Sequence, residues 1–170
     1  MRKPINVEDR EAITVRPVTP EDQEWVLEFM DIRWGAIRMV SRGQMYLPHE
    51  LPGFIAEREG EKVGLLTYHV EDNACEIVTV DSVETGQGIG TRLLEAIKKK
   101  ARDAGYRRLW VITTNDNLDA LAFYQKRGFI LVALHCDALS LSRRLKPEIP
   151  LVGKYGIPLR DEIELELNPL

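Results

Sequence analysis

Short apolar runs with strand-like spacing alternate with helical stripes along this chain. The predicted strands cover residues 13–16, 54–57, 63–68, 75–81, 109–113, 129–134 and 163–167. Helices are predicted to begin near residues 19, 89 and 118, and residues 33–43 to form a further helix, broken around Gly35. This order predicts an α/β (α+β) protein with a mixed central β-sheet flanked by helices on both faces.

The first predicted helix has a typical N-terminal signal. Thr19 and Pro20 precede two acidic residues, as expected of a cap, a proline at the first position and a favourable first turn. Trp25, Phe29 and Ile32 follow at helical spacing, so we expect these side chains to face the sheet.

A glycine-rich turn lies between the strand at residues 75–81 and the helix that begins near Ile89. Gly86, Gly88 and Gly90 let the backbone approach an anion closely, and the first N–H groups of a helix lack partners within it. The Rossmann fingerprint would need glycine where Thr91 stands, and the Gly-Lys-Ser/Thr of a phosphate loop is absent from the sequence. The turn therefore predicts an anion site of another kind.

Two segments, in order and at a suitable distance, carry a family resemblance. The loop Thr85-Gly86-Gln87-Gly88-Ile89-Gly90 follows a strand, and a second segment lies downstream. The second segment matches at Asn117, Ala120, Tyr124, Lys126, Gly128 and Phe129. Together, and most clearly over residues 62–130, they resemble the GNAT superfamily of acetyl-CoA-dependent N-acetyltransferases. Thr85 departs from the Arg or Gln that leads the family's loop.

The resemblance implies acetyl-CoA as the acyl donor. The backbone of Val78 and Val80 would bond the pantetheine arm, and the Val80 N–H would polarise the thioester carbonyl. Pyrophosphate would bind Gly86, Gln87, Gly88, Gly90, Thr91 and Arg92. Asn117 would contact the pantetheine arm, or it would only cap its helix. The alternative for the loop is a tight turn without a ligand.

Acetyl transfer needs a base for the amine and a hydrogen-bond donor for the leaving thiolate. An alkylamine has a pKa of about 10.4, so a base must remove its proton before attack. Glu76 is the first candidate for this base and Asp81 the second, with a surface carboxylate as the alternative for each. Tyr124 matches the family position beside the cofactor sulfur, where it would donate to the leaving thiolate; a packed core aromatic is the alternative.

The acceptor side is predicted from the same resemblance. It implies that the segment between the first two strands lines the acceptor, and its candidates for contact are Trp34, Arg38, Ser41, Arg42 and Tyr46. A surface loop with packed aromatics is the alternative. The sequence leaves the amine acceptor open. A rival from another class is a catalytically silent acyl-CoA-binding module, which Thr85 favours and Tyr124 disfavours.

Composition excludes several other classes of protein. The net charge of −4 argues against a nucleic-acid or anionic-membrane binder, and no apolar run could cross a bilayer, so we expect a cytoplasmic protein. Cys75 and Cys136 are far apart without metal-type spacing, so neither a disulfide framework nor a metal site is expected. The three histidines, at 49, 69 and 135, occur singly and are not assigned to the site.

The length of 170 residues predicts a single domain, and the resemblance implies that this domain is GNAT-like. Residues 1–11 are expected to be a loose tail, and residues 140–170 an extension with a basic cluster at 143–146, an extended loop and a last strand. That strand alternates apolar and acidic residues. We interpret its acidic face as solvated, with steering of a cationic amine as the alternative; if the strand is exposed, it could pair across a homodimer.

Overall fold

A computed structural model describes residues 12–167. The predicted tail at 1–11 lies outside the described residues. The helices are η1 (Pro20–Asp22), α2 (Gln23–Trp34), η2 (Pro48–Glu50), α3 (Ile89–Ala104), α4 (Leu118–Gln125), α5 (Ala138–Leu145) and η3 (Lys154–Gly156). The strands are β1 (Ile13–Pro17), β2 (Met39–Ser41), β3 (Gln44–Tyr46), β4 (Gly53–Arg58), β5 (Glu61–Glu71), β6 (Ala74–Ser82), β7 (Arg108–Thr114), β8 (Ile130–His135) and β9 (Glu162–Leu167).

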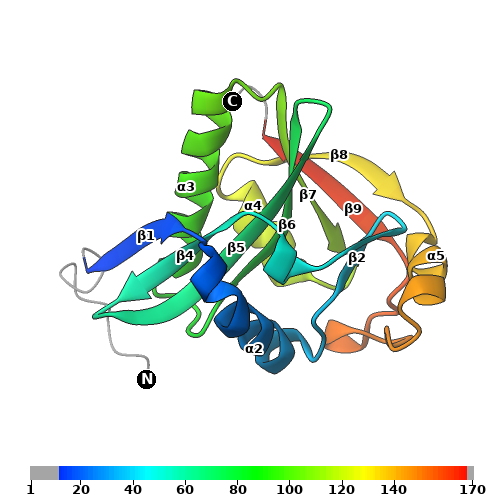
Figure 1. Cartoon of the computed structure of the whole chain (residues 1–170). Coiled ribbons are helices and arrows are strands. Elements are labelled where there is room, and N and C mark those ends of the chain that lie inside the picture. The colour runs from blue at the N-terminus through cyan, green and yellow to red at the C-terminus, as the bar shows by residue number, and fades with distance from the viewer. Residues whose placement is uncertain (1–11, 168–170) are drawn as a thin grey trace.

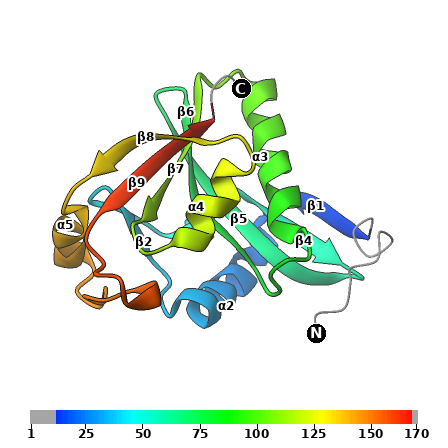
Figure 2. The same ribbon diagram turned by 180° about the vertical axis from the view of Figure 1, so that it is seen from behind.

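Seven strands form one mixed sheet in the order β1-β4-β5-β6-β7-β9-β8. Only β6 and β7 pair in parallel, and every other neighbouring pair is antiparallel. Helices α3 and α4 cover one face of the sheet (Figure 2), whereas α2 and the β2–β3 hairpin lie on the other (Figure 1). The predicted mixed sheet with helices on both faces is confirmed.

The two faces have separate apolar cores. The apolar stripe of α3, which includes Leu93 and Ile97, packs with Ile77, Leu109 and Leu165 of the sheet. On the other face, three residues of α2 pack against two of the sheet: Val26, Phe29, Met30, Ile55 and Leu65. None of the described helices is both long and apolar enough to span a membrane.

The expected face of α2 is partly wrong. Phe29 is buried and Trp25 packs at the margin of the core, but Ile32 is 80% exposed. The stripe that faces the sheet is Val26, Phe29 and Met30, because three- and four-residue spacing from Val26 selects this side of the helix.

The expected broken helix at residues 33–43 is wrong. Helix α2 ends at Gly35, which has φ +61°, and the chain then forms the hairpin β2–β3. Its two-residue turn, Arg42-Gly43, has positive φ at both positions, as the turn between twisted strands requires. The signal for this hairpin was glycine at the second turn position between two short apolar runs.

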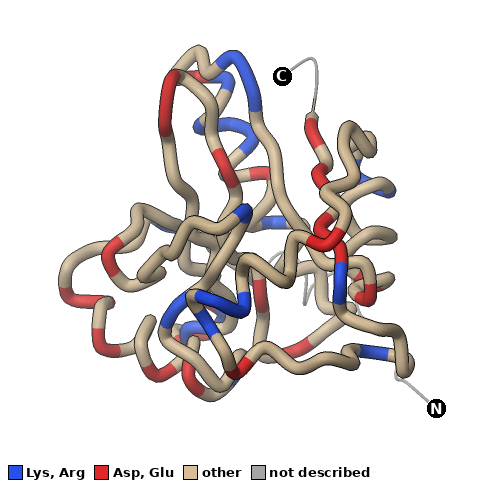
Figure 3. The backbone as a smooth tube through the Cα atoms, turned by 90° about the vertical axis from the view of Figure 1, so that its right-hand side faces the viewer, with Lys and Arg blue, Asp and Glu red and all other residues tan. Residues whose placement is uncertain are grey.

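Two expectations for the last part of the chain are also wrong. Helix α5 was not predicted, and β9 is not an exposed strand, because it lies between β7 and β8. The acidic positions that recur along β9 (Figure 3) are therefore not all solvated, and Glu162 and Glu164 are buried. The edge strands of this sheet are β1 and β8, so the basis for a dimer through the last strand is removed.

Candidate active site

The parallel strands β6 and β7 separate partway along their length. They pair from Ala74 with Arg108 to Ile77 with Val111, but β6 continues to Ser82 and β7 to Thr114. Beyond Ile77, the β7-facing backbone groups of β6 therefore lack a strand partner among the described residues. A flexible chain with amide groups can bond there as an added strand would.

A β-bulge lies at the point of separation. Thr67 pairs with Thr79, but the next residue, Tyr68, pairs with Ile77, so Val78 is the extra residue. Bulges redirect the backbone and are frequent beside active sites. Val78 and Val80, which were predicted to bind pantetheine, thus lie where β6 loses its neighbour.

The glycine loop connects β6 to α3. Gly86 and Gly88 have φ of +78° and +81°, and the first helical hydrogen bond runs from the Arg92 N–H to the Gly88 carbonyl at 3.1 Å. The N–H groups of Ile89, Gly90 and Thr91 come before this bond and therefore have no acceptor within the helix. They form the positive end of a 16-residue helix.

A cleft of about 1270 Å³ extends from this loop to α4. Its lining includes Tyr124 and eight of the nine residues predicted to bind the cofactor: Val80, Gly86, Gln87, Gly88, Gly90, Thr91, Arg92 and Asn117. Val78 is the ninth and is absent from the lining, whereas the second candidate base, Asp81, lines it. The structure thus brings both segments of the sequence resemblance to one cleft.

Arg127, which was not predicted, joins the two helices at the cleft. Its guanidinium donates to the Thr91 hydroxyl at 2.7 Å and lies 3.8 Å from the centre of the Phe123 ring. A Cβ at position 90 would come within 3.3 Å of the same ring, so glycine there permits α3 to approach α4. A cation within the second segment, three residues after Tyr124, was the available signal.

Asn117 caps the N-terminus of α4, which is the alternative role that the sequence left open for it. Its Oδ1 accepts the Ala120 N–H at 3.3 Å and the Lys154 ammonium at 3.1 Å. Since both contacts use the oxygen, the amide nitrogen remains available as a donor. Lys154 comes from η3, in the connection between β8 and β9, and it lines the cleft too. Sequence spacing alone could not place it there.

Tyr124 is buried between Phe123 and Phe129, with ring centres 5.2 and 5.4 Å away. Its hydroxyl makes no hydrogen bond to any residue of the described chain, although the side chain lines the cleft. Burial raises the pKa of Tyr124 above its usual value, so the hydroxyl remains protonated at neutral pH.

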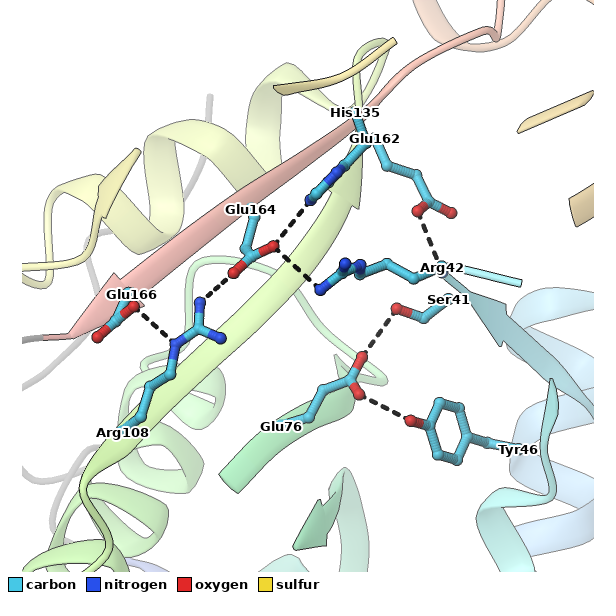
Figure 4. Close-up of polar contacts among 9 residues, drawn as sticks. All are labelled: Ser41, Arg42, Tyr46, Glu76, Arg108, His135, Glu162, Glu164 and Glu166. Carbon is cyan, nitrogen blue, oxygen red and sulfur yellow. Dashed lines mark hydrogen bonds and ion pairs between the residues drawn. The ribbon is translucent and has the colours of Figure 1, made fainter. Parts of the chain in front are cut away.

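Glu76 lies on the opposite face of the sheet (Figure 4). Its carboxylate accepts the Ser41 hydroxyl and the Tyr46 hydroxyl, each at 2.8 Å, and it is 4% exposed. Burial raises the pKa of Glu76 although the two hydroxyl groups oppose this shift. The other candidate base, Asp81, forms a bidentate ion pair with Arg33 at 2.9 and 3.1 Å.

The predicted acceptor contacts are divided between the two faces. Ser41, Arg42 and Tyr46 lie beside Glu76, whereas Trp34 lines the cleft near Arg33. Arg38 is in neither place, because it pairs with Glu148 at 2.7 Å.

Replacing Glu76 with Gln is expected to raise the melting temperature at neutral pH. The folded-state pKa lies above the unfolded value, so ionisation of this buried carboxylate destabilises the fold at pH above the folded pKa. That destabilisation disappears as pH falls below the ordinary value of 4.5. Thermal unfolding of both proteins between pH 4 and 8 should therefore show curves that converge in acid; a variant less stable at pH 8 would contradict this account.

Known proteins are similar to this chain in sequence. The sequence profile of the acetyltransferase (GNAT) family matches residues 19–129, so the chain belongs to this family. Two Bacillus subtilis proteins described as uncharacterized, YxbD and YdhI, are 41% and 44% identical to the chain. The alignments cover 90% and 80% of this chain and 97% and 86% of theirs.

Solved structures share the fold. The IAA acetyltransferase from Bacillus cereus has a TM-score of 0.70 at 24% identity, with 91% of this chain and 98% of that chain covered. A GNAT acetyltransferase from Elizabethkingia anophelis, with acetyl-CoA bound, has a TM-score of 0.64 at 24% identity, with coverage of 92% and 98%.

Proposed function

We propose that this chain is a single-domain N-acetyltransferase that moves an acetyl group from acetyl-CoA to a primary amine by direct attack in a ternary complex. The observation that carries the proposal is the cleft at the separation of β6 and β7, which joins the glycine loop to Tyr124. Neither cysteine lines this cleft, which favours direct attack over a cysteine-bound acetyl group.

The glycine loop and the start of α3 would hold the pyrophosphate. Backbone N–H groups at Gly88, Gly90 and Thr91 lie at the positive end of the helix, and Arg92 adds a cationic side chain. The pantetheine arm would then follow the free edge of β6 past Val78 and Val80, with the Asn117 amide nitrogen as a side-chain donor. This places the thioester near the bulge, where the Val80 N–H would stabilise charge on its carbonyl oxygen.

Tyr124 would donate to the sulfur as the carbon–sulfur bond breaks. A phenol of ordinary pKa is about 1.5 units less acidic than a thiol, and burial of Tyr124 widens this difference. A hydrogen bond to developing thiolate charge is therefore the favoured role. Glu76 would accept a proton from the amine, and its raised pKa makes it a stronger base than an exposed carboxylate.

Acetyl-CoA and CoA are expected to stabilise the protein, whereas NAD and ATP are not. A ligand that binds only the folded state at a hundredfold excess over Kd adds about 2.7 kcal/mol to the free energy of unfolding. For a chain of this size the melting temperature should rise by about 5–10 °C. An unchanged melting temperature in millimolar acetyl-CoA would count against the cleft as a cofactor site.

An assay of CoA release with a panel of amines distinguishes the two candidate functions, an enzyme and a silent acyl-CoA-binding module. The enzyme should release CoA faster with at least one amine than with water alone. Tight binding of acetyl-CoA without amine-dependent release would favour the silent module, which Thr85 also favours.

A further inference from the structure

The β2–β3 hairpin carries the two hydroxyl groups that hydrogen-bond Glu76, but it is not part of the large sheet. It forms a separate two-stranded sheet with three residues in each strand. An isolated hairpin is only marginally stable in water, so its position depends on what holds it. Three glutamates of the large sheet hold it by polar contacts: Glu76 of β6, and Glu162 and Glu164 of β9 (Figure 4).

We propose that Glu162 is a positioning residue for the base. By accepting the Arg42 N–H, its carboxylate fixes the hairpin turn so that the Ser41 hydroxyl stays on Glu76. The inference rests on the proposed function, in which Glu76 accepts a proton from the amine. Glu162 lines neither the cofactor cleft nor the pocket beside Glu76, so it acts through the hairpin and not by contact with a substrate.

The first reason is that the hairpin gives this N–H group no acceptor of its own. The ladder between the two strands ends at the pair Ser41–Gln44, which leaves Arg42 in the two-residue turn. Glu162 Oε2 accepts the Arg42 N–H at 3.1 Å, and Glu162 is only 2% exposed. Glu162 therefore supplies the acceptor that a backbone N–H group needs, and the contact ties the turn to β9.

The second reason is the backbone conformation of the turn. Arg42 has φ +49°, a left-handed value that residues with a side chain rarely adopt. Such a conformation persists where the surrounding structure fixes it. Glu162 binds the backbone N–H of Arg42, and Glu164 lies 3.6 Å from its guanidinium. The two acids act on one residue because side chains two positions apart on a strand share a face.

The third reason is that Glu162 is itself firmly held. Its backbone pairs with Thr114 of β7 on one side and with His135 of β8 on the other. Its second carboxylate oxygen accepts the hydroxyl of Ser142, a buried residue of α5, at 3.4 Å. A side chain fixed at both ends in this way can set the position of the hairpin relative to the sheet.

One peptide unit connects the contact with Glu162 to the contact with Glu76. The N–H group that Glu162 accepts belongs to the peptide bond after Ser41, so it fixes the Cα from which the Ser41 side chain reaches Glu76 at 2.8 Å. Burial raises the pKa of Glu76, and the hydroxyls of Ser41 and Tyr46 oppose that shift. Moving the turn should therefore weaken a hydrogen bond to the ionised carboxylate and raise the pKa of Glu76 further.

The charge of Glu162 has the opposite effect on Glu76. Removing a nearby negative charge would lower the pKa of Glu76 or leave it unchanged, so the sign separates position from charge. The other titratable and charged groups around Glu76 come from the hairpin, β5, the turn after it and the start of β7: Arg42, Tyr46, His69, Glu71, Asp72, Arg107 and Arg108. Those around Glu162 are Arg42 of the hairpin and His135 of β8.

Two conservative variants test the proposal and leave all of these groups in place. Glu162→Asp keeps the charge but shortens the side chain by one methylene, so the turn loses its contact or is drawn away from Glu76. Glu162→Gln removes the charge but keeps an oxygen acceptor for the Arg42 N–H, and its nitrogen can donate to the Ser142 hydroxyl oxygen. The readout is the titration of Glu76 by NMR of its carboxyl carbon, assigned by loss of the signal in Glu76→Gln, and it needs no turnover.

Glu162→Asp should raise the pKa of Glu76 by about one pH unit, the size expected for loss of a hydrogen bond to a charged group, and Ser41→Ala should do the same. Glu162→Gln should not raise it. Glu166→Asp is the matched control, because Glu166 lies on the same face of β9 and pairs with Arg108 instead of the hairpin. With any amine that the enzyme acetylates, Glu162→Asp should also move the acid limb of kcat/KM to higher pH, and Glu162→Gln should not.

An unchanged or lowered pKa of Glu76 in Glu162→Asp would overturn the inference while leaving the proposed function intact. An equal rise in Glu162→Gln or in Glu166→Asp would do the same, because neither change removes the acceptor of the Arg42 N–H. The expected titrations without release of CoA to any amine would instead remove the proposed function and leave the positioning of Glu76 supported. Thermal unfolding of each variant with and without CoA checks that it is folded.

Discussion

Replacing Gly88 with glutamate should remove the thermal stabilisation by acetyl-CoA. Gly88 immediately precedes α3, and its φ of +81° aims the following N–H groups at the position proposed for pyrophosphate. A carboxylate there would repel the phosphates and occupy the space that they need. The expected rise of about 5–10 °C should fall to nearly zero.

Gly105→Glu is a matched control for this variant. Gly105 follows the other end of the same helix with φ +68°, and a Cβ at either glycine would meet no atom within 4 Å. Both variants therefore add the same charge and about the same left-handed strain, which is on the order of 1–2 kcal/mol. Only Gly88→Glu should lose the response to acetyl-CoA. Equal responses would show that the pyrophosphate lies elsewhere.

Tyr124→Phe should lower kcat by about 10²–10⁴-fold with little change in the KM for acetyl-CoA. Tyr124 lines the cleft and its hydroxyl has no protein partner in the described chain, and this hydroxyl is proposed to act on charge that develops only as the thiolate leaves. Steady-state kinetics at several acetyl-CoA concentrations separates the two parameters.

Tyr68→Phe is the corresponding control, because Tyr68 is a buried tyrosine of β5 that does not line the cleft. It should keep kcat within about threefold of the parent. A rise in the KM for acetyl-CoA alone in Tyr124→Phe would make Tyr124 a binding residue. An unaltered kcat would remove it from the mechanism and leave a water as the proton donor.

The sequence predicted best those parts whose signals are local. The apolar stripe of α3 and the glycine turn before it are set by residues within one turn of each other, and both are present. The hairpin β2–β3 was missed because its strands are three residues each, and their periodicity is too short to distinguish from that of a helix.

The parts that could not be predicted depend on distant neighbours. Alternation correctly identified β9 as a strand, but its position between β7 and β8 depends on pairing partners that no local pattern encodes. For this reason the acidic face was interpreted as solvated, whereas Glu162 accepts the Arg42 N–H and Glu164 pairs with His135. Contacts of Glu76 with Ser41 and Tyr46 likewise join residues at least 30 positions apart.

The central position of β9 also affects the order of folding during synthesis. Strands β7 and β8 emerge from the ribosome well before β9, and until β9 inserts between them each lacks a neighbour that it has in the finished sheet. Meanwhile β8 carries Ile130, Leu131, Val132 and Leu134, which are more than 40% exposed even in the folded protein. A nascent chain with such an open apolar edge is prone to aggregate, so we expect this protein to depend on chaperones until synthesis has passed β9.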